Sequence, residues 1–259
     1  MPSNSTRKLR VGVIGLGMGR SHVRGFQAHP DCEVVAVADT DHARLSRARE
    51  EFGINRAHTD AMHLIEREQL DVIVIATPNK FHHPLTIAAL GHGAHVLCEK
   101  PMAMNAGEGR EMIAAAKQAG KRLMINFSYR FRAQSQALKR LVDEGVLGDV
   151  YSARTAWLRR SGFPGFGGWF TDKAMAGGGP LIDLGVHRID LALWLMGYPQ
   201  PEWIMGSTSD ALTLALGRAL ETPVRNLGRV AGGDINEAYR AELGDGRAAF
   251  VKTRGGAGP

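Results

Sequence analysis

The chain has 259 residues, 44% of them hydrophobic and 22% charged, which is typical of a folded globular protein with one large or two modest domains. The formal net charge is +6, and the basic residues are spread along the chain instead of forming a run. This distribution favours a mildly basic protein with a preference for anionic ligands and argues against nucleic-acid binding.

Cysteine usage and hydropathy predict the compartment. The two cysteines, Cys32 and Cys98, lie far apart and have no metal-ligand spacing, so we expect reduced thiols and no metal site. The polar segment Met1 to Arg10 lacks the apolar core of a signal peptide. No apolar run reaches the ~18 to 20 residues of a membrane span. We therefore expect a cytoplasmic location and no membrane partner.

A glycine-rich turn follows the first apolar stretch. Leu9 to Ile14 is typical of a buried strand and leads into Gly15, Gly17, Met18 and Gly19. A strand, a glycine turn and a helix open a dinucleotide-binding unit, because the glycines let the backbone meet a pyrophosphate at the helix N-terminus. Two glycines fit the usual spacing and the third comes one place early, so the turn alone is weak evidence. We assign these four turn residues to cofactor binding.

Asp39 strengthens this interpretation. It ends a second predicted strand, Glu33 to Ala38, and lies 24 residues after Gly15. A carboxylate near that distance binds the adenosine ribose 2′-OH and repels a 2′-phosphate, which favours NAD over NADP. The alternative is a helix N-cap or turn residue before a predicted helix, His42 to Phe52.

Strands continue to alternate with helices as far as residue 126, which predicts a mostly parallel sheet. Residues that end such strands face the ligand crevice. The elements that we expect are strands at Asp71 to Ala76, His95 to Cys98 and Arg122 to Asn126, and helices at Pro84 to Gly91 and Ala106 to Ala119. The polar residues that we expect at one edge of the sheet are Asn79, Glu99, Lys100 and Asn126.

A second polar cluster is predicted after the glycine segment Gly177 to Pro180. On a helix from Leu181 to Met196, the residues Asp183, His187 and Asp190 lie at positions i, i+4 and i+7 and share one face. An imidazole with a carboxylate one turn away is suited to moving protons. The alternative is a surface ion pair on an amphipathic helix. For Asp190, a structural role is as well supported as a functional one.

Further elements are expected between these two clusters and after them. Arg132 to Glu144 is typical of an amphipathic helix, and Val150 to Leu158 and Trp203 to Ser207 are predicted strands of a second domain. Tyr129 and Arg130 follow the last strand of the first domain. They can line a crevice between the domains, or pack where the domains join.

Together these segments resemble the Gfo/Idh/MocA family, the relatives of glucose–fructose oxidoreductase and inositol dehydrogenase. The resemblance covers about Leu9 to Ser207. It implies an α/β fold with an NAD(P)-binding Rossmann domain at residues 1–125, and a second α/β domain with an open, mainly antiparallel sheet at 126–209. It also implies NAD-dependent oxidation of a CH–OH group of a sugar, cyclitol or related polyol. The matching segments are Gly15 to His22, Ala76 to His82, Val96 to Ala103, Asn126 to Phe131 and Gly177 to Asp190.

The resemblance also implies roles for single residues. Lys100 is similar to the active-site lysine, and Asp183 and His187 are similar to the pair that orients the substrate and exchanges its proton. His187 would act as general base and Lys100 would stabilise the developing alkoxide. The cofactor-binding residues are then Gly15, Gly17, Met18, Gly19, Asp39, Thr77, Pro78, Asn79, His82, Glu99 and Lys100. The substrate-binding residues are Lys100, Asn126, Tyr129, Arg130, Asp183 and His187.

The last part of the chain, residues 210–259, is similar to the beginning of the fructosamine kinase family. We expect a helix at Ala211 to Leu220, a strand at Val224 to Val230, and a β-hairpin of Tyr239 to Leu243 with Arg247 to Lys252. The helical lobe of a kinase does not follow, so Lys252 is expected to be an ordinary exposed lysine.

Three interpretations of the whole chain therefore stay open. It is a truncated or chimeric oxidoreductase, a short protein whose last strands replace the missing part of the second sheet, or an NAD-binding fragment without activity. A relative of fructosamine kinases is a further alternative. If the chain is a truncated oxidoreductase, the sheet of its second domain is incomplete. The sequence then does not decide whether the chain forms a homo-oligomer.

Overall fold

The computed structural model describes residues 7–157, 168–202, 204, 224–230, 237–243 and 248–253. The chain divides into two compact units, residues 1–199 and 200–259. Within the described ranges, every helix is too short or too polar to cross a membrane.

The first unit is built on a six-stranded sheet in the order β3-β2-β1-β4-β5-β6, and every neighbouring pair is parallel. Side chains of β4 alternate between the two faces, because Ile73 and Ile75 belong to one buried cluster and Val74 to the other. Both faces are therefore apolar, as expected for a covered parallel sheet. The strands are β1 Leu9–Ile14, β2 Cys32–Ala38, β3 Arg56–His58, β4 Val72–Ile75, β5 His95–Glu99 and β6 Leu123–Asn126.

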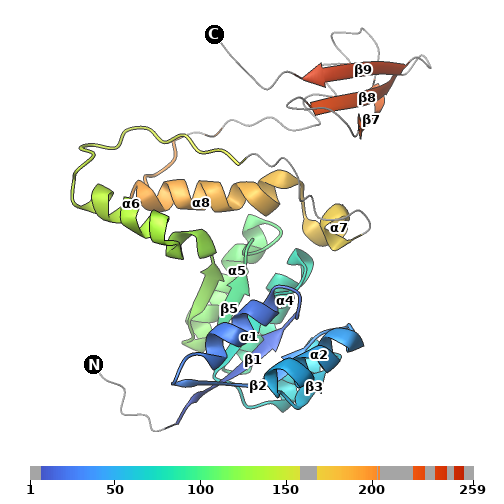
Figure 1. Ribbon diagram of the computed structural model, residues 1–259, viewed down its shortest axis with the longest axis vertical. Coiled ribbons are helices and arrows are strands. Elements are labelled where there is room, and N and C mark those ends of the chain that lie inside the picture. Colours follow the sequence, from blue (N-terminus) through green and yellow to red (C-terminus); the bar gives the residue numbers. More distant parts are fainter. Residues whose placement is uncertain are drawn as a thin grey trace. The chain divides into compact units, whose positions relative to one another are not determined.

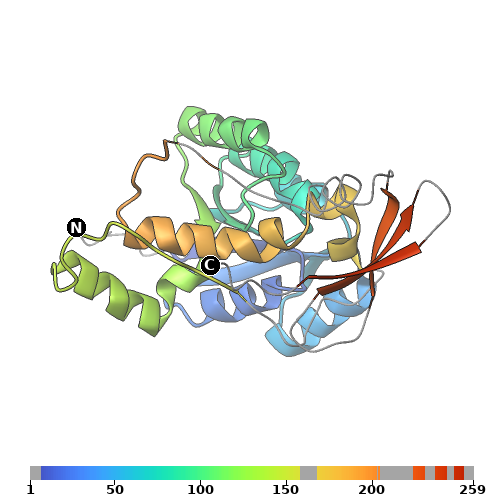
Figure 2. The same cartoon turned by 90° about the horizontal axis from the view of Figure 1, so that it is seen from above.

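Helices cover the two faces of this sheet (Figure 1). The cluster on one face contains Val23 of α1 and Leu45 of α2. The cluster on the other face contains Leu64 of α3, Leu90 of α4 and Met112 of α5. Figure 2 shows the sheet between these two helix layers. The helices are α1 Gly19–Gln27, α2 His42–Phe52, α3 Ala61–Arg67, α4 His82–Gly91 and α5 Ala106–Ala119, with the 3₁₀ turn η1 Asn79–Phe81 before α4.

Caps explain where two of these helices begin and end. Asp41 accepts hydrogen bonds from the first turn of α2, and Asn105 does the same for α5. Gly53 and Gly120 end the same helices in the left-handed conformation, which favours glycine. The predicted bounds of β1, α2 and α5 are confirmed. The short pair β3 and α3 was not predicted, although Asp60 caps α3 and gave a local signal.

After β6 the described part of the first unit is helical. One prediction here is wrong: residues 150–157 form no strand, and Leu158 lies outside the described residues. Strand propensity is not sufficient, because a strand needs a neighbour to receive its backbone hydrogen bonds. The elements are η2 Ser128–Phe131, α6 Ala133–Asp143, η3 Trp169–Thr171, α7 Lys173–Ala176, η4 Leu181–Gly185 and α8 Val186–Leu195.

The predicted helix from Leu181 to Met196 is present, but its first part, η4, has π-helical hydrogen bonding before α8 continues as an α-helix. Such a widened turn is frequent at functional sites. The π-helical turn changes the angle about the helix axis between Asp183 and His187. We had predicted the angle of an α-helix, in which residues four positions apart lie one turn apart. The two side chains still lie at the same end of the helix that follows the glycine segment.

The second unit contains a three-stranded antiparallel sheet in the order β7-β8-β9. Its strands are β7 Val224–Val230, β8 Glu237–Leu243 and β9 Ala248–Thr253. The predicted strand and the predicted hairpin are confirmed. The predicted helix at 211–220 lies outside the described residues, as does the predicted strand at 203–207 except for Ile204, which is in no strand. Among the described residues from 127 to 204 there is no strand, so the antiparallel sheet that we expected within 126–209 is not found in that described part.

Candidate active site

The glycine turn after β1 is shaped for a ligand that contacts its backbone. Gly15 has a φ of +89°, and a Cβ atom there would lie 2.5 Å from the carbonyl oxygen of Ala76. At Gly19 a Cβ atom would lie 2.9 Å from Cγ1 of Val13, so helix α1 approaches β1 closely. Gly19 thus serves the packing role of the third glycine despite its early position. Gly17 is exposed and has open space around it.

The N-terminus of α1 begins directly after this turn. Met18 is its N-cap residue, makes no side-chain capping hydrogen bond, and is 63% exposed. Unpaired N–H groups at a helix N-terminus attract anions such as a pyrophosphate. The open space at Gly17 and the uncapped helix end therefore fit a bound dinucleotide.

Asp39 lies at the end of β2 and is 9% exposed. One carboxylate oxygen accepts a hydrogen bond of 2.7 Å from Leu16 N, and the other accepts one of 2.9 Å from Asp41 N. Asp39 therefore holds the glycine turn in place, and Asp41 is the N-cap of α2. A carboxylate has about four lone-pair sites, so these bonds leave room for a ribose hydroxyl. Ribose binding by Asp39 stays a prediction.

Lys100 and Asp183 are brought together from positions far apart in the sequence. Lys100 follows β5, and its Nζ donates to Oδ1 of Asp183 at 2.7 Å and to the backbone oxygen of Asp183 at 2.9 Å. Both side chains are largely buried, with exposed fractions of 17% and 24%. An ammonium group has three N–H donors, so the third one stays available to another acceptor.

His187 lies in an aromatic setting near this pair and is 8% exposed. Its ring centroid lies 4.9 Å from that of Tyr129 and 5.9 Å from that of Trp157. Burial, followed by the charge of Lys100, lowers the pKa of His187 from 6.5 to about 4. The imidazole is therefore neutral at pH 7. Its Nδ1 is buried and has no hydrogen-bond partner in the described part of the chain.

Glu99 joins three elements just before Lys100. Its Oε1 accepts hydrogen bonds from His22 of α1 at 2.8 Å and from Asn126 at the end of β6 at 2.7 Å. Burial by itself would raise the pKa of Glu99, but these hydrogen bonds outweigh it and hold the pKa below the ordinary value. The network connects the helix after the glycine turn to β5, the strand directly before Lys100.

The turn after β4 is held mainly by hydrogen bonds within the protein. His82 is fully buried, with Nε2 at 3.0 Å from the oxygen of Thr77 and Nδ1 at 2.7 Å from the oxygen of Pro101. The amide of Asn79, which follows Pro78, donates to the oxygen of Ala176 at 2.7 Å. Binding of cofactor by this turn stays a prediction. Its one buried polar atom without a described partner is Oγ1 of Thr77.

Arg130 and Asp190 form a partly buried ion pair that supports the structural alternative for both. Nε of Arg130 donates to Oδ2 of Asp190 at 2.8 Å, and Nη2 donates to Oδ1. Asp190 raises the pKa of Arg130. Tyr129 instead lies against His187. Sequence reasoning did not single out Arg188, which follows His187 directly.

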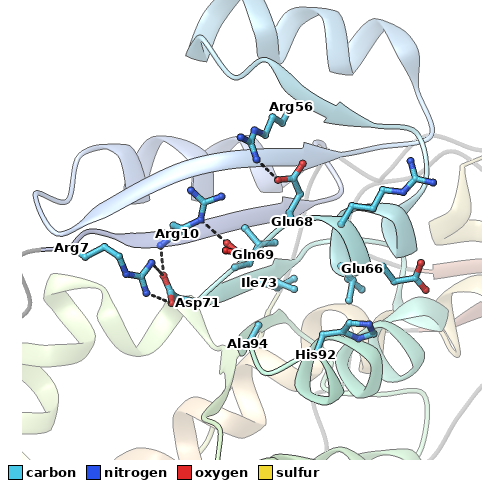
Figure 3. A pocket seen from close by; sticks show the side chains of 13 residues that line it. Arg7, Arg10, Arg56, Glu66, Glu68, Gln69, Asp71, Ile73, His92 and Ala94 are labelled. Carbon is cyan, nitrogen blue, oxygen red and sulfur yellow. Dashed lines mark hydrogen bonds and ion pairs between the residues drawn. The ribbon is translucent and has the colours of Figure 1, made fainter.

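A cavity of about 870 Å³ lies away from these residues, at the amino-terminal ends of the strands (Figure 3). Two of its arginines form ion pairs: Arg7 pairs with Asp71 at 2.7 Å, and Arg56 pairs with Glu68 at 2.7 Å. These pairs neutralise much of the local charge. In the described ranges, no group of three or more histidine, cysteine, aspartate or glutamate side chains is arranged to hold a metal ion.

Two family models match the chain. The model described as "Oxidoreductase family, NAD-binding Rossmann fold" of GFO_IDH_MocA matches residues 9–127, and the "GFO/IDH/MocA C-terminal domain" model matches residues 135–233. Together they cover most of the chain. The second match continues past Ser207, where we expected the resemblance to end, and includes β7 and part of the segment that we compared with fructosamine kinases.

Similar proteins include dehydrogenases of sugars and cyclitols. D-glucoside 3-dehydrogenase of Escherichia coli is 39% identical over 193 residues, which are 74% of this chain and 55% of that protein. Inositol 2-dehydrogenase 4 of Saccharopolyspora erythraea is 35% identical over 196 residues, which are 74% of this chain and 55% of that protein. The chain thus spans about half the length of these curated relatives.

Solved structures show the same fold. GenD2 from gentamicin A biosynthesis, in complex with NAD, superposes with a TM-score of 0.66 over 99% of this chain and 70% of that one, at 24% identity. The aldose-aldose oxidoreductase from Caulobacter crescentus gives a TM-score of 0.61 over 96% of this chain and 71% of that one, at 25% identity.

Proposed function

This chain belongs to the GFO/IDH/MocA oxidoreductase family, and we propose that it is an NAD-dependent dehydrogenase acting on a CH–OH group of a sugar, cyclitol or related polyol. The observation that carries the proposal is the meeting of Lys100, Asp183 and His187 from two distant segments. A cation, a carboxylate and a neutral imidazole supply the groups that alcohol oxidation needs.

The glycine turn and the N-terminus of α1 would hold the pyrophosphate of NAD, and Asp39 would hold the ribose. When bound, the nicotinamide ring supplies the hydride-accepting carbon. The protein's own groups handle the proton and the charge. The neutral ring of His187 has one nitrogen with an available lone pair, so it can accept the hydroxyl proton of the substrate.

Lys100 would stabilise the negative charge that develops on the substrate oxygen. Two of its N–H groups are held by Asp183, so the third can donate to that oxygen. Asp183 then acts as the residue that fixes the direction of the ammonium group. Burial, and after it the charge of Lys100, lowers the pKa of His187 and keeps the imidazole unprotonated before the reaction.

Replacing Lys100 with methionine tests this proposal. We expect turnover of a polyol panel, followed by the absorbance of NADH, to fall by about 100-fold or more, because the donor to the oxyanion is lost. The affinity for NAD, measured by calorimetry, should change much less than turnover, because the glycine turn and Asp39 stay intact. Lys117, which is exposed on α5, gives the matched control K117M. Equal turnover in K100M and the unmodified chain would contradict the role.

The rival interpretation is an NAD-binding fragment without activity. A thermal melt with NAD separates the possibilities, since a ligand at 100 times its Kd should stabilise the native state by about 2.7 kcal/mol. A shift with NAD together with turnover of a polyol supports the dehydrogenase. A shift without turnover of any polyol supports the binding protein.

For residues 210–259 we propose that the similarity to fructosamine kinases carries no phosphotransfer activity. The oxidoreductase C-terminal model extends to residue 233, which supports this proposal. The test is release of ADP from ATP in the presence of a fructosamine. Sustained, substrate-dependent release by the purified chain would contradict it.

A further inference from the structure

Arg188 is placed unusually for an arginine near an active site. It follows His187 on α8, and its Cζ lies 5.0 Å from the ring centroid of Trp157 and 5.3 Å from that of Tyr129. Its Nε is buried and has no hydrogen-bond partner within the described ranges. The guanidinium group is thus held beside two aromatic rings while a donor stays unsatisfied.

The aromatic rings do not supply the hydrogen-bond acceptor that Nε of Arg188 lacks among the described residues. A ring face attracts the charge of a guanidinium group, but it offers no strong acceptor to the N–H groups, which lie in the guanidinium plane. A buried donor without an acceptor costs stability. Such a cost is commonly retained at functional sites, where a ligand supplies the missing acceptor.

Lys100 and Arg130, the cations near Arg188, each have an acidic partner. Lys100 is paired with Asp183, and Arg130 is paired with Asp190. In the cavity at the other end of the sheet, Arg7 and Arg56 are also paired with acidic side chains (Figure 3). Arg132, whose Cζ lies 3.7 Å from the ring centroid of Tyr129, adds a further positive charge without an acidic partner among the described residues. The aromatic wall, which we define as the rings of Tyr129 and Trp157, is therefore flanked by more positive than negative charge.

The same wall contacts the imidazole of His187. Tyr129 and Trp157 have ring centroids 5.2 Å apart, and each ring lies against both His187 and Arg188. A small substrate whose hydroxyl group reaches His187 therefore has Arg188 as a neighbour on the same wall. A guanidinium group binds carboxylate and phosphate through two parallel N–H donors, which a neutral hydroxyl cannot match.

We propose that Arg188 binds a carboxylate or phosphate oxyanion on the substrate, so that the polyol oxidised is an acidic sugar, either a uronate or a sugar phosphate. This inference rests on the proposed dehydrogenase function and narrows its substrate class. It assigns to Arg188 the role of recognising the acidic group, while Lys100 and His187 serve the hydroxyl that reacts.

The test compares glucose, glucuronate and glucose 6-phosphate as substrates with NAD in excess. We expect kcat/KM to be at least about tenfold higher for one of the two acids than for glucose, because the oxyanion satisfies the buried donor. In R188Q this ratio should fall by about tenfold, and in R188K it should take an intermediate value. R110Q removes an exposed arginine of α5 and should keep the ratio of the unmodified chain.

Binding measurements separate this inference from the proposed function. Calorimetry of the NAD-saturated chain with the same three compounds needs no turnover. Tighter binding of an acid than of glucose, lost in R188Q, supports the inference even if no compound is oxidised. Equal affinities for the acids and glucose, or an unchanged preference in R188Q, would overturn it. If R188Q does not melt cooperatively, R188K replaces it in these measurements. Tighter binding of glucuronate indicates recognition of a carboxylate, and tighter binding of glucose 6-phosphate indicates recognition of a phosphate.

Discussion

Replacing His187 with asparagine is expected to reduce the loss of stability in acid. In the folded chain, burial and then the charge of Lys100 lower the pKa of His187 from 6.5 to about 4. Above pH 6.5 the ring is neutral in both the folded and the unfolded chain. As the pH falls below 6.5, the unfolded chain binds a proton that the folded chain does not, so the free energy of unfolding decreases until about pH 4.

The magnitude follows from the two pKa values. One pKa unit corresponds to about 1.4 kcal/mol, so a change from 6.5 to about 4 amounts to roughly 3 kcal/mol once the pH is below both values. The side chain is only 8% exposed, so solvent screens little of this effect. The asparagine variant lacks the titrating group, and its free energy of unfolding should fall by that much less between pH 7 and pH 4.

Urea unfolding of the two chains at several pH values, followed by circular dichroism, measures this difference. His63, which is exposed on α3, gives the control H63N for removal of a histidine as such. The reasoning is refuted if H187N and the unmodified chain lose the same free energy of unfolding between pH 7 and pH 4. That result would mean that His187 is not held neutral by its surroundings.

Three other substitutions test the site. Gly15→Ala should destabilise the chain by about 1 to 3 kcal/mol and weaken NAD binding, because its Cβ atom would meet the backbone oxygen of Ala76. Thermal melting measures the change in stability, and calorimetry measures the affinity for NAD. Arg130→Ala should cost roughly 3 kcal/mol in urea unfolding by leaving the buried Asp190 unpaired, and a loss below 0.5 kcal/mol would contradict this. Glu99→Gln should cost about 1.5 to 3 kcal/mol at pH 7; because the pKa of Glu99 is lowered, the difference should shrink as the pH falls below 4.5.

Much of the first domain was predictable because its signals are local. Alternating apolar strands, aspartate and asparagine caps, and glycine stops are read within a few residues, and β1, α2 and α5 were found with their bounds. The prediction of a strand at 150–158 was wrong over the described residues 150–157, because strand formation is not a local property. Strand formation depends on a hydrogen-bonding neighbour, and nothing within the segment specifies one.

The spacing of Asp183 and His187 indicated a polar pair, and the resemblance to the Gfo/Idh/MocA family implied the catalytic roles of this pair and of Lys100. That Lys100 meets Asp183 through both a side-chain and a backbone oxygen is a property of the fold alone. The same holds for the network of Glu99 with His22 and Asn126, whose members belong to three elements.

The sequence by itself predicted the Rossmann architecture through periodicity that is local along the chain, and it proposed Lys100, Asp183 and His187 through the resemblance to the Gfo/Idh/MocA family. Only the tertiary structure decided the charge state of His187 and the exceptional position of Arg188. Both depend on burial and on side chains contributed by distant segments, and the energy of an ionisable group is set by the surroundings that folding assembles around it.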